Sequence, residues 1–250
     1  MAGHKRTTIV LQERDLRLLE ALQSMRVINR EQAKVVAGFH STRRANDRLL
    51  MLSRAGFLKR AFIGSREAVY WLPGKAVEER SQKAGGSGAE PAALFLKHRL
   101  EINRVNLLVQ YCGIPVRGWW FGSWRAFQQP LSPTLPLIPD GYFELGSAAG
   151  FRPIFLEVDL GTEAVPVIAK KVNLYLQLGA SGEFGQLFNR SQFRVLVITT
   201  GQRRLENLRA AVAKRTDKIF WLGTLDLLSP EKFWSTCWLR PTGDHLQSIL

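Results

Sequence analysis

A run of small residues, Ala84-Gly-Gly-Ser-Gly-Ala-Glu-Pro91, divides the chain into two stretches that must each build their own hydrophobic core. The run holds no large apolar side chain that could anchor it, which is typical of a linker between domains. With 250 residues, the chain is long enough for two domains of ordinary size. The sequence therefore predicts an N-terminal domain over residues 1–75, a flexible linker over 76–92 and a C-terminal domain over 93–250.

Charge is concentrated in the N-terminal third. The formal net charge of the chain is +14, and residues 1–75 carry +9 of it. Such an excess favours a polyanionic partner, of which nucleic acid is the better candidate than an anionic membrane. No run of about eighteen apolar residues is present and the first residues are polar, so we expect a cytoplasmic protein without membrane contact. Cys112 and Cys237 lie far apart, which supports neither a disulfide framework nor a zinc site.

The first 75 residues show the pattern of three helices followed by a hairpin. Leu16, Leu19 and Leu22 recur at helical spacing, and a second short helix is expected over 30–37. Ser41 offers an N-cap for a basic amphipathic helix over 42–55. Strands on either side of a turn at 64–67 complete the pattern. This order predicts a winged helix-turn-helix.

The segment Leu49-Leu-Met-Leu-Ser-Arg-Ala-Gly-Phe-Leu-Lys-Arg60 resembles the junction of recognition helix and wing in many bacterial winged-helix regulators. The resemblance implies a set of major-groove contacts, where arginine can reach guanine and asparagine can read adenine. These residues are Arg43, Arg44, Asn46 and Arg48. It also implies phosphate contacts from the wing residues Lys59, Arg60 and Arg66. The alternative is that the arginines only solvate an exposed helix face.

Past the linker, the pattern indicates alternating helices and strands. A helix is expected over 94–111, followed by strands over 116–127, 138–145 and 154–160. The remaining elements are a helix over 166–178, a strand over 193–199, a helix over 202–214 and a strand over 218–222. The C-terminal half is therefore expected to be an α/β domain.

Three carboxylates fall on two of these strands. Asp140 begins one strand, and Glu157 and Asp159 lie two residues apart in the next, so that both point to the same face. Neighbouring carboxylates repel each other, and the usual reason for such a set is a hard divalent cation. Asp140, Glu157 and Asp159 are therefore candidate ligands of Mg²⁺ or Mn²⁺, which would activate water for phosphodiester hydrolysis.

The spacing from Asp140 to Glu157-x-Asp159 resembles the active-site signature of PD-(D/E)xK nucleases, with Asp159 where that family has lysine. Together with the N-terminal pattern, the stretch from Pro139 to Tyr175 resembles the replication-relaxation family of plasmids, conjugative elements and phages. The resemblance implies a winged helix-turn-helix followed by a restriction-endonuclease-like α/β domain with a mixed central sheet. It also implies double-stranded DNA and a relaxase or replication protein as partners.

Lys171 and Tyr175 share one face of the expected helix and would point toward the carboxylates. In a live nuclease, Lys171 would activate the attacking water and Tyr175 would contact a phosphate, with Lys170 as the alternative lysine. In the opposing interpretation, Glu157 and Asp159 are remnants held in a structural polar network. Two functions remain open at this stage. The first is a DNA-binding protein of a mobile element, without a cofactor, whose C-terminal domain adds DNA contact, homodimerisation or partner docking, with Trp119, Trp120 and Trp124 as candidates for a dimer interface. The second is a metal-dependent endonuclease.

Overall fold

The computed structural model describes residues 9–64, 67–74, 89–162 and 164–250. It divides into two compact units, Met1–Leu107 and Leu108–Leu250, here called the N-terminal unit and the C-terminal unit. The linker expected over 76–92 lies outside the described residues up to position 88. Within the described residues, no helix is both long and apolar enough to cross a membrane.

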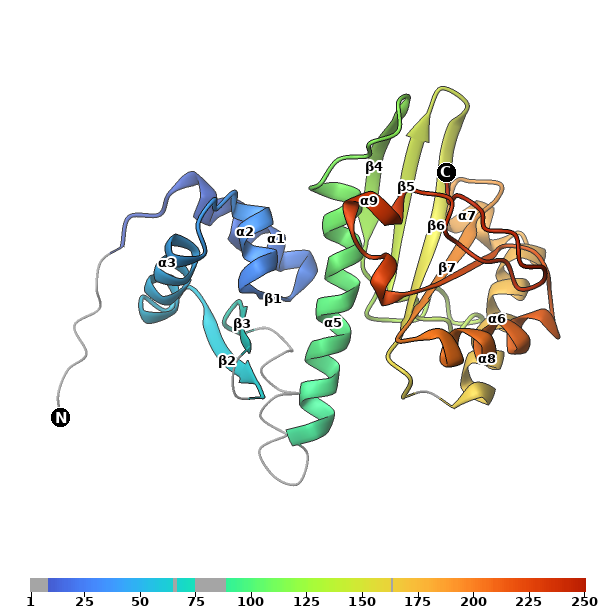
Figure 1. The fold of residues 1–250 in the computed structure, drawn as a ribbon, viewed down its shortest axis with the longest axis horizontal. Coiled ribbons are helices and arrows are strands. Elements are labelled where there is room, and N and C mark those ends of the chain that lie inside the picture. The colour runs from blue at the N-terminus through green and yellow to red at the C-terminus, as the bar shows by residue number, and fades with distance from the viewer. Residues whose placement is uncertain (1–8, 65–66, 75–88, 163) are drawn as a thin grey trace. The chain divides into compact units, whose positions relative to one another are not determined.

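The N-terminal unit contains the three helices and the hairpin that the sequence predicted. The helices are α1 (Glu13–Met25), α2 (Arg30–Ala37) and α3 (Thr42–Arg54), and the hairpin strands are β2 (Lys59–Ile63) and β3 (Glu67–Trp71). A short strand that was not predicted, β1 (Val27–Asn29), joins them in an antiparallel sheet of order β1-β3-β2. Figure 1 shows these elements in blue and cyan.

Local sequence explains where the helices begin and end. The Asn29 side chain accepts a hydrogen bond from the backbone N–H of Gln32 and so caps α2. Gly38 ends α2 in the left-handed region, with a φ of 66° that favours glycine. The buried face of α1 is formed by Leu18 and Leu22, whereas Leu16 is 54% exposed, so the predicted helix is present but its apolar stripe is rotated.

Helix α5 (Ala89–Gln110) begins five residues before the helix expected at 94, and most of it packs on the N-terminal unit. Its Leu96 and Leu100 are buried against strand residues of that unit, including Trp71. The Gln32 side chain donates a 2.7 Å hydrogen bond to the carbonyl of Leu100, and the Asn103 amide donates to the carbonyls of Met25 and Val27. The compact N-terminal unit therefore extends to Leu107, past the expected boundary.

The C-terminal unit is built on a five-stranded mixed sheet of order β4-β5-β6-β7-β8, of which Figure 1 labels β4, β5, β6 and β7 side by side. The first three strands are antiparallel and the last two run parallel to β6. The strands are β4 (Trp119–Arg125), β5 (Gly141–Ser147), β6 (Gly150–Asp159), β7 (Arg194–Thr199) and β8 (Phe220–Thr224). The helices are α6 (Val165–Ala180), α7 (Glu183–Phe188), α8 (Gln202–Ala213) and α9 (Pro230–Phe233), and a 3-10 turn, η1, spans Leu225–Leu227. The α/β fold with a mixed central sheet is as predicted.

One face of this sheet is covered by α6 and α8. Phe155 on β6 contacts Tyr175 on α6 and Phe193 before β7, with ring centroids 5.4 and 5.2 Å apart. Leu208 of α8 belongs to the same buried cluster. Because side chains alternate along a strand, Glu157 and Asp159 share the face of Phe155 and point under these two helices.

Candidate functional site

Glu157 is the centre of a buried polar cluster beneath α6. Its side chain is only 9% exposed and accepts two hydrogen bonds, at 2.9 Å from Lys171 Nζ and at 2.6 Å from Tyr175 Oη. Lys171 and Tyr175 are four residues apart on α6 and so lie on one helix face. Lys170, one position earlier, is exposed. The structure therefore brings together Glu157 and the two α6 residues that the sequence singled out.

Burial has the largest effect on the pKa of Glu157. It raises the pKa of Glu157 to about 7, and the negative charge of Asp140 acts in the same direction, whereas Lys171 and the Tyr175 hydrogen bond oppose the rise. Burial and the negative charge of Glu157 raise the pKa of Tyr175 well above its usual range, so the Tyr175 hydroxyl remains a hydrogen-bond donor.

Asp140 lies directly before β5 and is held beside β6. Its Oδ2 accepts a 2.8 Å hydrogen bond from the backbone N–H of Val158, and its own N–H donates to the carbonyl of Leu156. These two contacts bracket Glu157 in sequence, so the hairpin brings Asp140 next to Glu157, where its charge raises the pKa of that residue.

Asp159 is bound differently from the other two carboxylates. Arg204 on α8 donates to it twice, from Nε at 2.7 Å and Nη2 at 3.0 Å, and the hydroxyl of Thr199 donates at 2.8 Å. The backbone N–H of Gly161 adds a fourth contact at 3.2 Å. Burial pushes the pKa of Asp159 upward, but the hydrogen bonds from Arg204 and Thr199 outweigh it and hold that pKa below its usual range. No sequence pattern indicates Arg204 as the partner of Asp159, because the two residues lie 45 positions apart.

The predicted three-carboxylate metal site is therefore not formed. The described residues contain no group of three or more acidic, histidine or cysteine side chains placed to hold a metal ion. The reason is that both oxygens of Asp159 are committed to Arg204. Asp140 and Glu157 remain side by side, but both Glu157 oxygens already accept hydrogen bonds from Lys171 and Tyr175. This pair would hold Mg²⁺, which is commonly bound by one or two carboxylates together with substrate phosphates, only after one of those hydrogen bonds is released. The cavity at Glu157 measures about 20 Å³, enough for a single water-sized group.

A second candidate site is the outer face of α3 and the neighbouring hairpin. Arg43, Arg44 and Asn46 are exposed, and the Arg43 side chain is 92% exposed with only a 3.9 Å contact to Asp47. They project outward because the opposite face of α3 is anchored in the core by three fully buried residues, Ala45, Leu49 and Leu52. Lys59 and Arg60 on β2 are also exposed. Arg66, the third predicted wing residue, lies outside the described residues.

Arg48, which was predicted to contact the major groove, has a different position in the structure. Its guanidinium forms a two-pronged ion pair with Asp15 on α1, through Nε at 2.9 Å and a second, shorter contact from Nη2, and Nη2 also donates to the carbonyl of Val10. The Arg48 side chain is 12% exposed and that of Asp15 is completely buried. Arg48 therefore ties α3 to α1 and does not lie on the outer face with Arg43.

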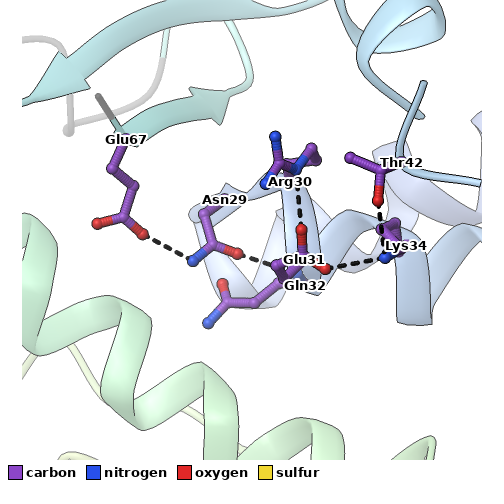
Figure 2. Close-up of polar contacts among 7 residues, drawn as sticks. All are labelled: Asn29, Arg30, Glu31, Gln32, Lys34, Thr42 and Glu67. Atoms are coloured by element: carbon purple, nitrogen blue, oxygen red, sulfur yellow. Dashed lines mark hydrogen bonds and ion pairs between the residues drawn. The ribbon is translucent and has the colours of Figure 1, made fainter. Parts of the chain in front are cut away.

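Polar contacts around the start of α2 link this helix to the start of α3 and to the hairpin, as Figure 2 shows. Lys34 on α2 bridges Glu31, at 3.0 Å, and the hydroxyl of Thr42, the first residue of α3, at 3.2 Å. Asn29 donates a 2.8 Å hydrogen bond to Glu67 on β3. These contacts join α2 to α3 and to the hairpin, the elements that carry the exposed basic residues.

The fold and its sites thus define a two-unit protein, with a basic surface of helix and hairpin in one unit and a buried carboxylate cluster in an α/β unit. Residues 19–189 match the profile of the replication-relaxation family, and the chain belongs to that family. A search among curated proteins finds no match. Among solved structures, restriction endonuclease FokI aligns at 12% identity and a TM-score of 0.31, over 86% of this chain and 43% of that one. A likeness at that TM-score is too slight to indicate function.

Proposed function

We propose that the N-terminal unit is a winged helix-turn-helix that binds double-stranded DNA, and that the protein acts in the replication or mobilisation of a plasmid, conjugative element or phage. Membership of the replication-relaxation family supports a role in replication or mobilisation. The net charge of +14 supports a polyanionic partner. In this proposal the protein works in the cytoplasm, where that DNA is found.

The observation that carries the proposal is the two-sided character of α3. Its inner face is fixed by fully buried apolar residues, and its outer face presents Arg43, Arg44 and Asn46 to solvent. An α-helix fits the major groove of B-form DNA, where these side chains are the types that read base edges. Lys59 and Arg60 on the adjoining strand are exposed, and in this proposal they neutralise phosphates. The major groove of A-form RNA is too narrow for such a helix, which favours DNA.

The test is the affinity for labelled duplex DNA, measured by fluorescence anisotropy over a range of salt concentrations. Arg43→Ala/Arg44→Ala is expected to weaken binding by about tenfold or more, since each good base contact contributes ~1–3 kcal/mol. Arg17→Ala/Arg203→Ala removes the same charge from exposed arginines on α1 and α8 and serves as the matched control. If both double variants bind as the wild type does, the proposed DNA surface is wrong.

A second candidate function is a metal-dependent DNA endonuclease that the N-terminal unit delivers to its site. The specific observation in its favour is the contact between Lys171 and Glu157 beside Asp140. Asp140 and Glu157 would hold Mg²⁺ or Mn²⁺, which would supply an activated water and neutralise charge on the phosphate. Lys171 would then orient the attacking water, and Tyr175 would donate to a phosphate oxygen in place of Glu157.

Incubation of supercoiled and linear plasmid with the protein, with and without Mg²⁺ or Mn²⁺, tests this second function. A nuclease would cut only with metal, and Glu157→Ala would abolish cleavage while duplex affinity through α3 stayed nearly unchanged. If no cleavage occurs with either metal, the endonuclease proposal fails and the carboxylates have a structural role.

Protein partners form the last part of the proposal. β4 is at one edge of the five-stranded sheet, and its Trp120 is 49% exposed. Sheet edges with exposed apolar side chains are common sites of association. We therefore place a homodimer contact, or the contact with a relaxase or replication protein, at this edge. Light scattering of the wild type and of Trp120→Ser measures the molecular mass in solution and so tests the homodimer contact.

A further inference from the structure

A second basic site lies in the C-terminal unit, away from Glu157. A cavity of about 560 Å³ opens at the start of strands β6, β7 and β8, whereas Glu157 and Asp159 are at the far end of β6. Its lining includes Phe151, Arg152, Arg190, Arg194 and Trp221. Arg194 and Trp221 alternate with the core residues Val195 and Phe220, so they point to the sheet face opposite the one that α6 and α8 cover.

The charges at this cavity are not balanced. Arg190 pairs with Glu144 at 2.8 Å, but Arg152 and Arg194 make no ion pair within the described residues. Both instead donate to the same backbone carbonyl, that of Ile249, at 3.4 and 2.6 Å. Burial, together with the positive charges of Arg152 and Arg240, lowers the pKa of Arg194 to about 10. Three guanidinium groups therefore repel one another where a nearby anion would relieve the repulsion.

Aromatic rings hold these guanidinium groups in place. Arg194 and Arg240 lie over the Trp221 ring, at 4.3 and 3.8 Å from its centroid, and Arg152 lies over Trp119 at 4.6 Å. Stacking on a ring fixes the plane of a guanidinium and keeps its edge pointing outward as a donor. Nη1 of Arg152 and of Arg194 donates to Ile249, so a ligand would be bound by the Nε and Nη2 donors of each. The cavity therefore offers oriented donors, as a built anion site requires.

We propose that this cavity binds phosphate groups through Arg152 and Arg194. Forked arginine donors match phosphate and carboxylate oxygens alike, but a phosphate dianion or a strand of phosphodiesters supplies the greater charge that a cluster of three arginines calls for. The cavity is also far larger than a carboxylate, which leaves room for a phosphate together with the group it is attached to. The site goes beyond the proposed function, since it does not involve α3 or the hairpin.

The test uses the full chain carrying Arg43→Ala/Arg44→Ala, so that the proposed duplex contact of α3 is removed from the measurement. Titration calorimetry in a buffer free of phosphate and sulfate follows two probes, inorganic phosphate and a single-stranded oligothymidylate without terminal phosphates. Arg152→Gln/Arg194→Gln is expected to weaken binding by about tenfold or more, a loss of ~1.4 kcal/mol for each factor of ten. Arg117→Gln/Arg203→Gln removes two exposed charges from the same unit and is expected to change binding little.

The outcomes separate the sources of the phosphate. Loss of both probes in Arg152→Gln/Arg194→Gln indicates a site for the DNA backbone, and loss of inorganic phosphate alone indicates a site for free or terminal phosphate. Equal binding of both probes by the two glutamine variants overturns the proposal and leaves the arginines as anchors of Ile249. Should the Arg152→Gln/Arg194→Gln protein fail to fold, Arg152→Lys/Arg194→Lys keeps the charge but loses the forked donors. Unchanged phosphate affinity in that lysine variant overturns the proposal equally.

Discussion

Arg204 donates hydrogen bonds from Nε and Nη2, at 2.7 and 3.0 Å, to Asp159, the residue that stands where the nuclease signature would have a lysine. The acid at this position therefore links β6 to α8. The partners are largely removed from water, with 3% of the Asp159 side chain and 18% of the Arg204 side chain exposed. Asp159, which departs from the signature, has Arg204 as a basic partner. The positive charge of Arg204 explains how a second carboxylate is tolerated two residues from Glu157.

Loss of this pair is expected to destabilise the C-terminal unit. Arg204→Gln should lower the free energy of unfolding by about 3 kcal/mol, because breaking a buried ion pair leaves the other charge uncompensated. Arg203→Gln, at the exposed neighbouring position, should change it by less than ~0.5 kcal/mol. Urea unfolding of the two variants measures both values. Equal stability of the two variants would show that the pair contributes nothing to the fold.

The titration of Glu157 predicts a loss of stability between pH 4.5 and 7. Burial raises the pKa of Glu157 from an ordinary 4.5 to about 7, so in this window the folded protein keeps a proton that the unfolded chain has released. Stability falls with rising pH wherever the folded state binds more protons. This contribution is therefore complete below pH 4.5 and lost as the pH rises through 7.

Glu157→Gln isolates this effect, because the amide stays neutral at every pH. The free energy of unfolding of the wild type, minus that of Glu157→Gln, should fall from pH 4.5 to 7 and then level off. Urea unfolding at several pH values gives the difference, in which the other carboxylates largely cancel. A difference that is constant or rises across the window would contradict the raised pKa.

Arg48 is expected to matter for stability rather than for DNA contact. Arg48→Ala leaves the fully buried Asp15 carboxylate without its partner and should lower the free energy of unfolding by about 3 kcal/mol. Arg44→Ala, at an exposed position on the same helix, should leave stability nearly unchanged and weaken duplex binding. Unfolding curves and anisotropy at low temperature measure the two properties separately. A stable Arg48→Ala protein with weakened DNA binding would restore Arg48 to the contact set.

Periodicity and turn chemistry predicted the longer helices and strands because both depend on residues close in the sequence, but they missed the short elements β1, α7 and α9. They could not identify the partners of Arg48 and Asp159, since Asp15 and Arg204 lie far away along the chain. An arginine on an amphipathic helix has the same pattern whether it faces solvent or a distant buried acid. Likewise, the pattern of α5 indicated an apolar face but not the unit against which that face packs.

Helix α5 leads to the last prediction, that the N-terminal unit needs residues beyond the sequence-predicted domain to be stable. A fragment of residues 1–75 lacks Leu96, Leu100 and Leu107, each buried against this unit and each contributing ~1.5–3 kcal/mol on burial. A fragment of residues 1–110 retains them, together with Asn103. We expect the longer fragment to unfold cooperatively and at a clearly higher temperature than the shorter one, as followed by circular dichroism.

The full chain offers an independent check on the same packing. Asn103→Ala removes the buried amide that donates to the carbonyls of Met25 and Val27. The expected loss is ~1–3 kcal/mol in the free energy of unfolding. Asn173→Ala, at an exposed position on α6, is the matched control and should have little effect. If the short fragment melts like the long one and Asn103→Ala matches its control, α5 does not stabilise the N-terminal unit and the boundary belongs near residue 75.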